Sequence, residues 1–196
     1  MDRRAFFDHH ASNWDAMERE DIGPKLHRVV SEAEVGRGDY VLDVGTGTGI
    51  IIPYILEATG VDGRVLAVDI SWEMLLAASA KGFSKSVGFL QADIEYTGLP
   101  DEEFDRVICN AAFPHFTDRG HALQEMVRML KPGGTLVISH PIGREAVNNL
   151  HRSAGEAVAE DNVPTPEKMR VLMESVGLTD IRVIDELEFY LAFGRK

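Results

Sequence analysis

The chain has 196 residues, of which 44% are apolar and 27% are charged, an ordinary balance for a soluble globular protein. This length is sufficient to bury a substantial core and predicts a single domain over residues 1–196. A formal net charge of −12 argues against general binding to nucleic-acid phosphates or anionic membranes, which require a basic surface. The one cysteine, Cys109, excludes an intrachain disulfide, so we expect a reducing, cytoplasmic compartment. No apolar run is long enough to span a bilayer, and the residues after Met1 lack the hydrophobic region of a signal peptide.

Aromatic and histidine side chains are concentrated in residues 5–15. Four of them fall near one face of a helix: Phe6, Phe7, His10 and Trp14. This face predicts either a cover over one end of the core or a lid over a cofactor. Since the adjacent His9 and His10 point apart on a helix and no carboxylate–histidine motif completes a site, we expect no metal.

The central part of the chain alternates short apolar runs with amphipathic segments. We expect strands over residues 40–44, 64–69, 87–91, 104–110 and 135–139. We expect helices over residues 23–33, 50–58, 72–80 and 118–130. This alternation predicts an α/β fold with right-handed βαβ units and a parallel sheet that carries helices on both faces.

The last part of the chain predicts two more helices and a closing pair of strands. They are expected over residues 143–160, 166–177, 181–184 and 189–193. In the first of these helices, three side chains are expected to face solvent rather than an anionic substrate: Arg144, His151 and Arg152.

A glycine turn follows the first predicted strand, within residues 41–50. Its glycines at positions 45, 47 and 49 let the backbone take φ > 0 and leave no Cβ between the main chain and a ligand. Amide groups at the start of the next helix would face that ligand. The turn therefore predicts a site for a nucleotide-like cofactor, without identifying it.

A polar side chain stands at or just beyond the end of each of the first four strands. These side chains are Asp43, Asp69, Asp93 and Asn110. In parallel sheets, ligands bind beyond the carboxyl ends of the strands, near the topological switch point. We therefore expect these four groups to meet at one site.

The residues around the turn favour one cofactor. A dinucleotide fingerprint requires glycine where Ile50 stands. Asp43 would repel a pyrophosphate and suits a ligand that carries positive charge, as the sulfonium and ammonium groups of S-adenosylmethionine do. Asp69 lies 20 residues beyond Gly49, where a carboxylate accepts hydrogen bonds from both ribose hydroxyls.

These motifs resemble those of class I S-adenosylmethionine-dependent methyltransferases, in order and in spacing. The resembling segments are residues 43–49, Asp69, residues 92–94 and residues 130–134, together with residues 7–15 ahead of the core. Within that class the chain is most similar to the small-molecule group that includes the ubiquinone and menaquinone biosynthesis enzymes. The resemblance covers about residues 5–140.

The resemblance implies a Rossmann-like three-layer sandwich with a seven-stranded, mostly parallel sheet whose last strand is antiparallel. Residues 1–35 would form a helical N-terminal lid, residues 39–140 the cofactor-binding core, and residues 141–196 the substrate-side helices and a closing hairpin.

The resemblance also assigns cofactor contacts by position. Residues 45–49 would pass beneath the methionine portion, Asp69 would hold the ribose, and Ile70 would pack on the adenine. Asp93 would bind the adenine amino group, with the main-chain amide of Ile94 beside it. The expected cofactor-binding residues are Asp43, Gly45, Thr46, Gly47, Thr48, Gly49, Asp69, Ile70, Asp93, Ile94, Asn110, Ala111 and Trp14.

The substrate side is defined by fewer residues. Asn110 and Ala111 would lie beside the methyl-donor sulfur, and Trp14, with His10, would close over the cofactor or face the substrate. His115 stands where small-molecule members often carry a histidine, and its imidazole would accept a proton from the acceptor. His140 is a second candidate for this catalytic role. Because methyl transfer is an in-line displacement at a reactive sulfonium, orientation alone is the alternative to a base.

Residues 110–113 have the spacing of the Asn/Asp-Pro-Pro-Tyr/Phe motif of methyltransferases that modify amino groups. Alanine replaces both prolines, which removes the rigid turn of that motif. We therefore expect a methyltransferase with a small-molecule acceptor, S-adenosylmethionine as cofactor, and no nucleic-acid or membrane partner; a homodimer stays open. Two alternatives are a nicotinamide-dependent oxidoreductase, which Ile50 and Asp43 disfavour, and a non-catalytic protein that binds S-adenosylmethionine.

Overall fold

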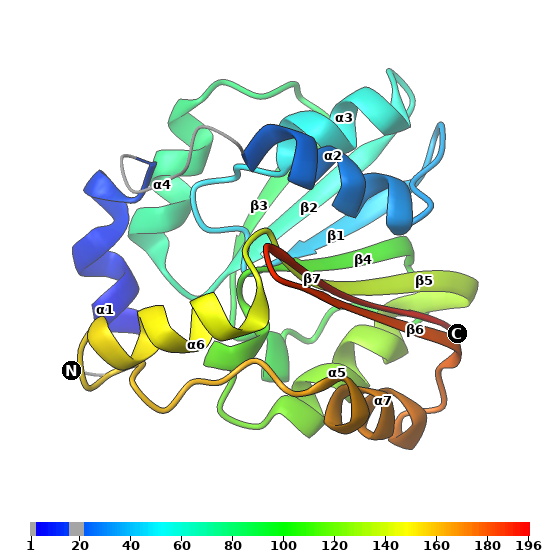
Figure 1. Ribbon diagram of the computed structural model, residues 1–196. Helices are drawn as coiled ribbons and strands as arrows, with labels where there is room; N and C mark the ends of the chain where they lie inside the picture. Colours follow the sequence, from blue (N-terminus) through cyan, green and yellow to red (C-terminus); the bar gives the residue numbers. More distant parts are fainter. Residues whose placement is uncertain (1–2, 16–21) are drawn as a thin grey trace.

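A computed structural model of the chain describes residues 3–15 and 22–196 (Figure 1). Residues 1–2 and 16–21 of the expected N-terminal lid lie outside the described residues. A seven-stranded sheet forms the centre, in the order β3-β2-β1-β4-β5-β7-β6. The strands are β1 Tyr40–Val44, β2 Arg64–Asp69, β3 Val87–Gln91, β4 Phe104–Asn110, β5 Leu130–His140, β6 Thr179–Glu186 and β7 Phe189–Arg195.

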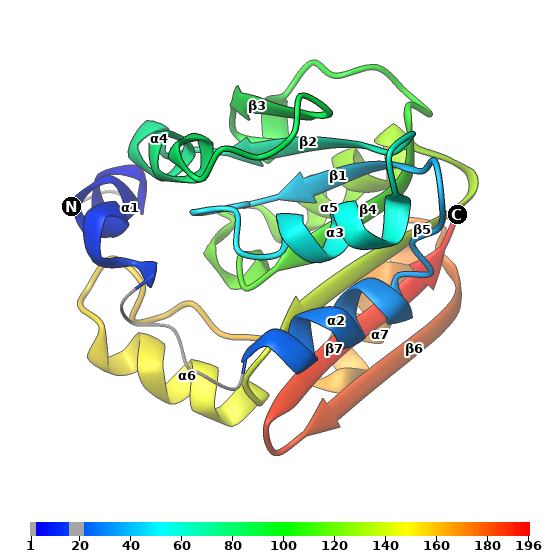
Figure 2. The ribbon, with the colours of Figure 1, turned by 90° about the horizontal axis from the view of Figure 1, so that it is seen from above.

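Helices cover both faces of the sheet, so the molecule has three layers (Figures 1 and 2). The helices are α1 Arg3–His10, α2 Ile22–Glu32, α3 Ile52–Thr59, α4 Trp72–Ala80, α5 Arg119–Met129, α6 Arg144–Ser153 and α7 Pro166–Ser175, with short 3₁₀ turns η1 Ala11–Asn13, η3 Ile94–Tyr96 and η4 Phe113–His115. Apolar side chains of α2 and α3 pack on one face of the sheet, and those of α5 and α7 pack on the other. No helix in the described part of the chain is long and apolar enough to cross a membrane.

The strand directions confirm the expected fold class. β1 pairs in parallel with β2 and β4, and β4 pairs in parallel with β5. Among the described strands, β7 alone has the reverse direction, and it pairs antiparallel with β5 and with β6. β5 starts at Leu130, five residues before the expected start at Thr135, because Leu130 already pairs with Phe104 and a register shift follows before Thr135 pairs with Arg106.

Side-chain caps define where several helices begin. Ser71 accepts a hydrogen bond from the amide of Met74 at the start of α4, and Asp118 accepts one from the amide of His121 at the start of α5. Both cap otherwise unpaired amides of a first helical turn. In contrast, α3 starts at Ile52 instead of Ile50, since the glycine turn extends further than expected.

The helix expected over residues 143–160 is shorter, and this prediction was wrong in its extent. α6 ends at Ser153, and Gly155 has φ = 112°, which breaks the helical path. Residues 154–165, called the 154–165 link below, then run irregularly to α7. His151 is buried instead of facing solvent, because its Nδ1 lies 2.5 Å from the main-chain oxygen of Asp161 in this link.

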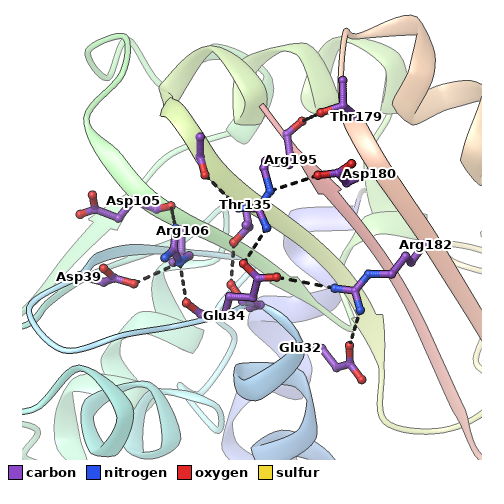
Figure 3. A network of polar contacts seen from close by, with 12 residues as sticks. Glu32, Glu34, Asp39, Asp105, Arg106, Thr135, Thr179, Asp180, Arg182 and Arg195 are labelled. Atoms are coloured by element: carbon purple, nitrogen blue, oxygen red, sulfur yellow. Dashed lines mark hydrogen bonds and ion pairs between the residues drawn. The ribbon is translucent and has the colours of Figure 1, made fainter.

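The two ends of the sheet differ in chemistry. α1 and α6 lie at the end where the parallel strands finish, and the C-terminus lies at the opposite end (Figures 1 and 2). At that opposite end, Glu34 after α2 accepts hydrogen bonds from Arg195 at 2.7 Å and is paired with Arg182 at 3.9 Å (Figure 3). Arg106 of β4 donates to the main-chain oxygen of Glu34 at 2.9 Å. This polar network joins α2 to three strands, away from the predicted site.

Candidate active site

A cavity of about 160 Å³ lies at the carboxyl ends of β1, β2 and β4. The expected cofactor-binding residues that line it are Asp43, Gly45, Thr46, Gly47, Thr48, Asp69, Ile70, Asp93, Ile94, Asn110, Ala111 and Trp14. His115 lines the same cavity. Two expected site residues, Gly49 and His140, are not in its lining. Gly49 packs toward Ile52 and Phe83 behind the turn.

The glycine turn comes close to the loop after β4. Gly45 has φ = 66°, and a Cβ on it would lie 2.3 Å from the Cβ of Ala112. The amides of Gly45 and Thr46 donate to the main-chain oxygen of Val68, and the amide of Gly47 donates to Asp69. These hydrogen bonds fix the turn to the end of β2. Gly45 and Gly47 bring main chain without a Cβ to the cavity, beside Thr46 and Thr48.

Asp43 is a buried carboxylate at this surface. Its Oδ2 accepts a hydrogen bond of 2.5 Å from the hydroxyl of Thr46. Burial, opposed by this hydrogen bond and assisted by the nearby Asp69, raises the pKa of Asp43 to about 7. A group of this kind gains a partner when a cation enters the cavity, which matches the ligand charge inferred from the sequence.

Asp69 ends β2 with both carboxylate oxygens engaged by the main chain. Oδ2 accepts from the amide of Gly47 and Oδ1 from the amide of Ser71, each at 2.8 Å. These bonds fix the carboxylate while each oxygen keeps a second lone pair for a ligand hydroxyl. Burial nevertheless raises the pKa of Asp69. Asp93, beyond β3, accepts from the amide of Glu95 and caps η3.

The end of β4 is bent sharply. Ala111 has φ = 58°, a conformation unusual for a residue with a Cβ. Its amide donates to the main-chain oxygen of Ser139 at 2.7 Å, and the hydroxyl of Ser139 donates to Oδ1 of Asn110 at 2.9 Å. Backbone conformations of this kind cluster at functional sites, where the surrounding structure holds them.

The N-terminal segment, defined as residues 3–15, borders the cavity. Arg3, Phe7 and Trp14 are part of the lining, whereas His10 is not. Nδ1 of His10 lies 2.8 Å from the main-chain oxygen of Phe6 in the same helix. The sequence left two alternatives for this segment, a cover over the core or a lid over a cofactor. Trp14 lies beside the cavity, as a lid requires, whereas His10 does not line it.

Two carboxylates fasten the N-terminal segment to the core. Asp8 accepts from the hydroxyl of Ser71 at 2.6 Å, and Asp15 accepts from the hydroxyl of Thr48 at 2.5 Å. Asp15 also lies 2.8 Å from Nζ of Lys81. In contrast, none of the eight described residues of α1 is buried. The segment is thus held by polar contacts to the glycine turn and α4 more than by a packed apolar face.

His115 is held by a carboxylate from the 154–165 link. Its Nδ1 lies 2.8 Å from Oδ2 of Asp161, whose side chain is only 2% exposed. The ring of Phe7 meets that of His115 edge-on, with 5.1 Å between centroids. Burial alone would raise the pKa of Asp161, but hydrogen bonds from His115 and Arg3 lower it to about 2. Asp161 is therefore an anion at neutral pH.

His140 is surrounded differently. It ends β5, is buried, and its Nε2 has no hydrogen-bond partner within the described residues. Burial, followed by the charges of His115 and His151, lowers the pKa of His140 to about 3. A neutral imidazole with such a low pKa is a poor proton acceptor at neutral pH, which separates His140 from His115 as a candidate base.

Sequence reasoning missed Arg3 and Asp161. Asp161 follows Glu160 in a polar stretch that resembles a solvated surface, and Arg3 precedes the aromatic cluster in an equally ordinary setting. Their pairing across 158 positions leaves no local pattern. Among residues 3–15 and 22–196 no group of three or more His, Cys, Asp or Glu side chains is arranged to hold a metal ion.

The residues that line the cavity suit S-adenosylmethionine in their chemistry. The buried Asp43 carboxylate suits a cationic amino-acid portion, and Asp69 suits a ribose. A Cβ on Gly45 would clash with Ala112, so the turn requires glycine there. The sheet order with an antiparallel β7 and this site at the strand ends define the class I S-adenosylmethionine-dependent methyltransferases.

Comparison with known proteins agrees with this class. The family described as "Methyltransferase domain" matches residues 42–138. The ubiquinone/menaquinone biosynthesis C-methyltransferase UbiE of Hahella chejuensis is 31% identical over 189 residues, which cover 87% of this chain and 74% of that protein. UbiE of Methylococcus capsulatus is 30% identical over 226 residues, which cover 98% and 90%. A crystal structure of a SAM-dependent methyltransferase from Aquifex aeolicus aligns with a TM-score of 0.76 at 25% identity, covering 94% of this chain and 97% of that one.

The chain belongs to the UbiE-like S-adenosylmethionine-dependent methyltransferases. Its cofactor is S-adenosylmethionine, and the nicotinamide-dependent alternative is not favoured by these relatives.

Proposed function

We propose that this methyltransferase transfers a methyl group to a small, planar, hydroxylated acceptor, with His115 as the general base. The observation that carries the proposal is the pairing of His115 with the buried Asp161 carboxylate, at 2.8 Å, in the lining of the cavity that also holds the glycine turn. A base and a methyl-donor site that share one cavity suit an acceptor whose proton leaves as its new bond forms.

The cofactor supplies a methyl group bound to a sulfonium. We propose that Asp43 and the turn at residues 45–48 hold its amino-acid portion and that Asp69 holds the ribose. Asp93 with Ile70 and Ile94 would surround the adenine, and Asn110 with Ala111 and Trp14 would flank the sulfonium. The contacts of Asp43 and Asp69 support these roles, since each carboxylate keeps free lone pairs at the cavity.

The proposed base works through its two nitrogens. If Nδ1–H of His115 donates to Asp161, the neutral ring carries its lone pair on Nε2, which accepts the acceptor's hydroxyl proton. The Asp161 carboxylate then stabilises the imidazolium that results. Loss of that proton raises the electron density on the acceptor and makes it a better nucleophile toward the methyl group.

The lining also indicates the kind of acceptor. Three aromatic residues, Phe7, Trp14 and Phe116, line the cavity, and such a lining favours a flat, apolar molecule. The relatives are named as C-methyltransferases of ubiquinone and menaquinone biosynthesis. We therefore propose a ring carbon next to an ionised hydroxyl as the methylated atom.

The experiment offers the enzyme S-adenosylmethionine with hydroxylated aromatic acceptors and with matched amines and thiols. We expect S-adenosylhomocysteine to form with the hydroxylated compounds and the methyl group to be located on carbon by NMR. Transfer only to the amines or thiols would contradict the proposal. Cofactor binding without turnover on any of them would favour the non-catalytic alternative.

The base is tested separately with His115→Gln. We expect kcat to fall about 100-fold or more, with the Kd for S-adenosylmethionine unchanged, because general-base catalysis contributes about 10²–10⁴-fold. His27→Gln is the control, since His27 is exposed on α2 and pairs with Glu57. An unchanged kcat and pH–rate profile in the His115 variant would show that orientation alone supplies the rate.

We further propose that the protein acts in the cytoplasm. Its one cysteine, Cys109, is buried and free, as suits a reducing compartment. Cell fractionation followed by immunoblotting measures this. The homodimer remains a prediction that light scattering on the purified protein measures.

A further inference from the structure

Arg3 of α1 also donates hydrogen bonds to the Asp161 carboxylate that contacts His115. Nη2 of Arg3 donates to Oδ1 at 2.6 Å, and Nε donates to Oδ2 at 3.3 Å. His115 uses Oδ2 as well, so one carboxylate receives three hydrogen bonds from two residues. This is a fork-to-fork arrangement in which guanidinium geometry fixes the plane of the carboxylate.

Among the described residues, Arg3 and His115 supply the hydrogen bonds to the Asp161 carboxylate. The 154–165 link has no helix or strand, and the main-chain contacts of Asp161 are to Val158 and to the ring of His151. The torsion of the Asp161 side chain is therefore set mainly by Arg3 and His115. The carboxylate determines which ring nitrogen of His115 keeps its proton. Because Arg3 orients the carboxylate, it also influences which tautomer of His115 forms.

Arg3 reaches Asp161 only while the N-terminal segment lies on the core. That position depends on the contacts of Asp8 with Ser71 and of Asp15 with Thr48. Phe7, one helical turn from Arg3, packs against the ring of His115 at the same time. One helix thus contacts both members of the His115–Asp161 pair and borders the cofactor cavity.

We propose that Arg3 is a positioning residue, which orients the Asp161 carboxylate so that it receives the Nδ1 proton of His115 and leaves Nε2 free to accept a proton. The inference rests on the proposed function of His115 as base, and it adds that the N-terminal segment completes the base when it covers the cavity.

The experiment reads the tautomer directly, in the protein without cofactor or acceptor. Long-range ¹H–¹⁵N NMR on ¹⁵N-histidine-labelled protein distinguishes a protonated Nδ1 from a protonated Nε2, and the His115→Gln spectrum assigns the signals. We expect wild-type His115 to carry its neutral-form proton on Nδ1. In Arg3→Gln we expect a mixture of both tautomers, a kcat lower by about tenfold, and a Kd for S-adenosylmethionine within about threefold of wild type.

Two further variants make the result specific. Arg4→Gln removes the neighbouring charge on the same helix, where Arg4 is exposed and pairs with Asp8 at 3.8 Å, and we expect the His115 signals to stay as in wild type. Arg3→Lys keeps the charge but not the planar fork, and we expect partial recovery of the Nδ1-protonated form. Circular dichroism confirms that each variant is folded.

An unchanged His115 spectrum in a folded Arg3→Gln protein would overturn the inference. A spectrum that changes while kcat does not would support the positioning role and show instead that His115 is not the base. The failure of the inference is therefore distinguishable from the failure of the proposed function.

Discussion

Asp43, a proposed contact to the cofactor, is a buried carboxylate near the end of β1. The carboxylate is buried beside Thr46, and burial raises its pKa to about 7. A positively charged ligand stabilises the ionised form, so binding and proton release are linked at this position. Whether the carboxylate is charged before the ligand arrives therefore depends on pH in the physiological range.

This linkage predicts that the affinity for S-adenosylmethionine falls as the pH decreases. Below a pKa of about 7 the proton competes with the cofactor's positive charge for Asp43, and above it the carboxylate is already ionised. We expect the Kd to rise by at most about 30-fold from about pH 8 to about pH 5.5, measured by isothermal titration calorimetry in buffers of different ionisation enthalpy. These buffers also report the proton released.

Asp43→Asn provides the comparison for that prediction. The amide keeps the size of the side chain but has no charge, so we expect weaker binding at about pH 8 and a flatter dependence on pH. Asp62→Asn, at an exposed position in the loop before β2, should retain the wild-type profile. A wild-type Kd that is independent of pH in this range would contradict the linkage.

At the scale of elements, the N-terminal segment is attached to the core chiefly by polar contacts. None of the described residues of α1 is buried, while Asp8 and Asp15 bond to Ser71 and Thr48. A segment held in this way opens more easily than a helix with a packed apolar face. We propose that it acts as a lid, whose opening precedes release of the product.

The double change Asp8→Asn and Asp15→Asn should therefore accelerate dissociation of the cofactor. Both carboxylates are partly exposed, so each lost bond contributes less than a buried one, and we expect a dissociation rate constant about tenfold higher. Stopped-flow tryptophan fluorescence measures this rate, with Trp14 in the cavity lining. A rate equal to that of wild type would argue against the lid.

The whole molecule separates the contacts that bind ligands from those that hold the layers together. The network of Figure 3 lies at the amino ends of the parallel strands, opposite the cavity. It joins the end of α2 to β6 and β7 through Glu34, Arg182 and Arg195. Contacts at that end affect the free energy of unfolding without touching the site.

Glu34→Gln should accordingly destabilise the protein and leave cofactor binding intact. The side chain is partly exposed, so we expect a loss of about 1 kcal/mol or less in the free energy of unfolding, which shrinks further at high salt. Urea denaturation followed by circular dichroism measures the loss, and calorimetry measures the Kd. Glu174→Gln, exposed on α7, is the control. An altered Kd with unchanged stability would contradict this separation.

The sequence predicts the first four strands well because each is a short run rich in apolar residues, and the apolar runs of β1, β2 and β4 are largely buried. The expected bounds of residues 40–44, 64–69, 87–91 and 104–110 agree with β1 to β4. The helix over residues 143–160 was predicted too long, because apolar positions continue at helical spacing up to Val158. Tertiary contacts of Asp161 with Arg3 and His115 compete with that local preference.

In the candidate site, too, the sequence predicts what depends on local pattern and not what depends on tertiary contacts. Asp43, Asp69, Asp93 and Asn110 could be placed together from the sequence, because parallel strands bring their ends to one edge. The Asp161 carboxylate could not, since His115 and Asp161 are separated by 46 positions, on the short turn η4 and on an irregular link. Periodicity contains no information about such a pair.

The cofactor site and the proposed base differ in how far apart along the chain their hydrogen-bonded residues lie. Two hydrogen bonds fix the glycine turn. The bond from Gly47 to Asp69 closes a loop of 22 positions, and the bond from Gly45 to Val68 closes a loop of similar length. The bond between Arg3 and Asp161 joins positions 158 apart. Short loops close first, because their ends are brought together at a smaller entropic cost. The entropic cost of closing the loop is therefore smaller for the glycine turn of the cofactor site than for the Arg3–Asp161 pair beside the proposed base.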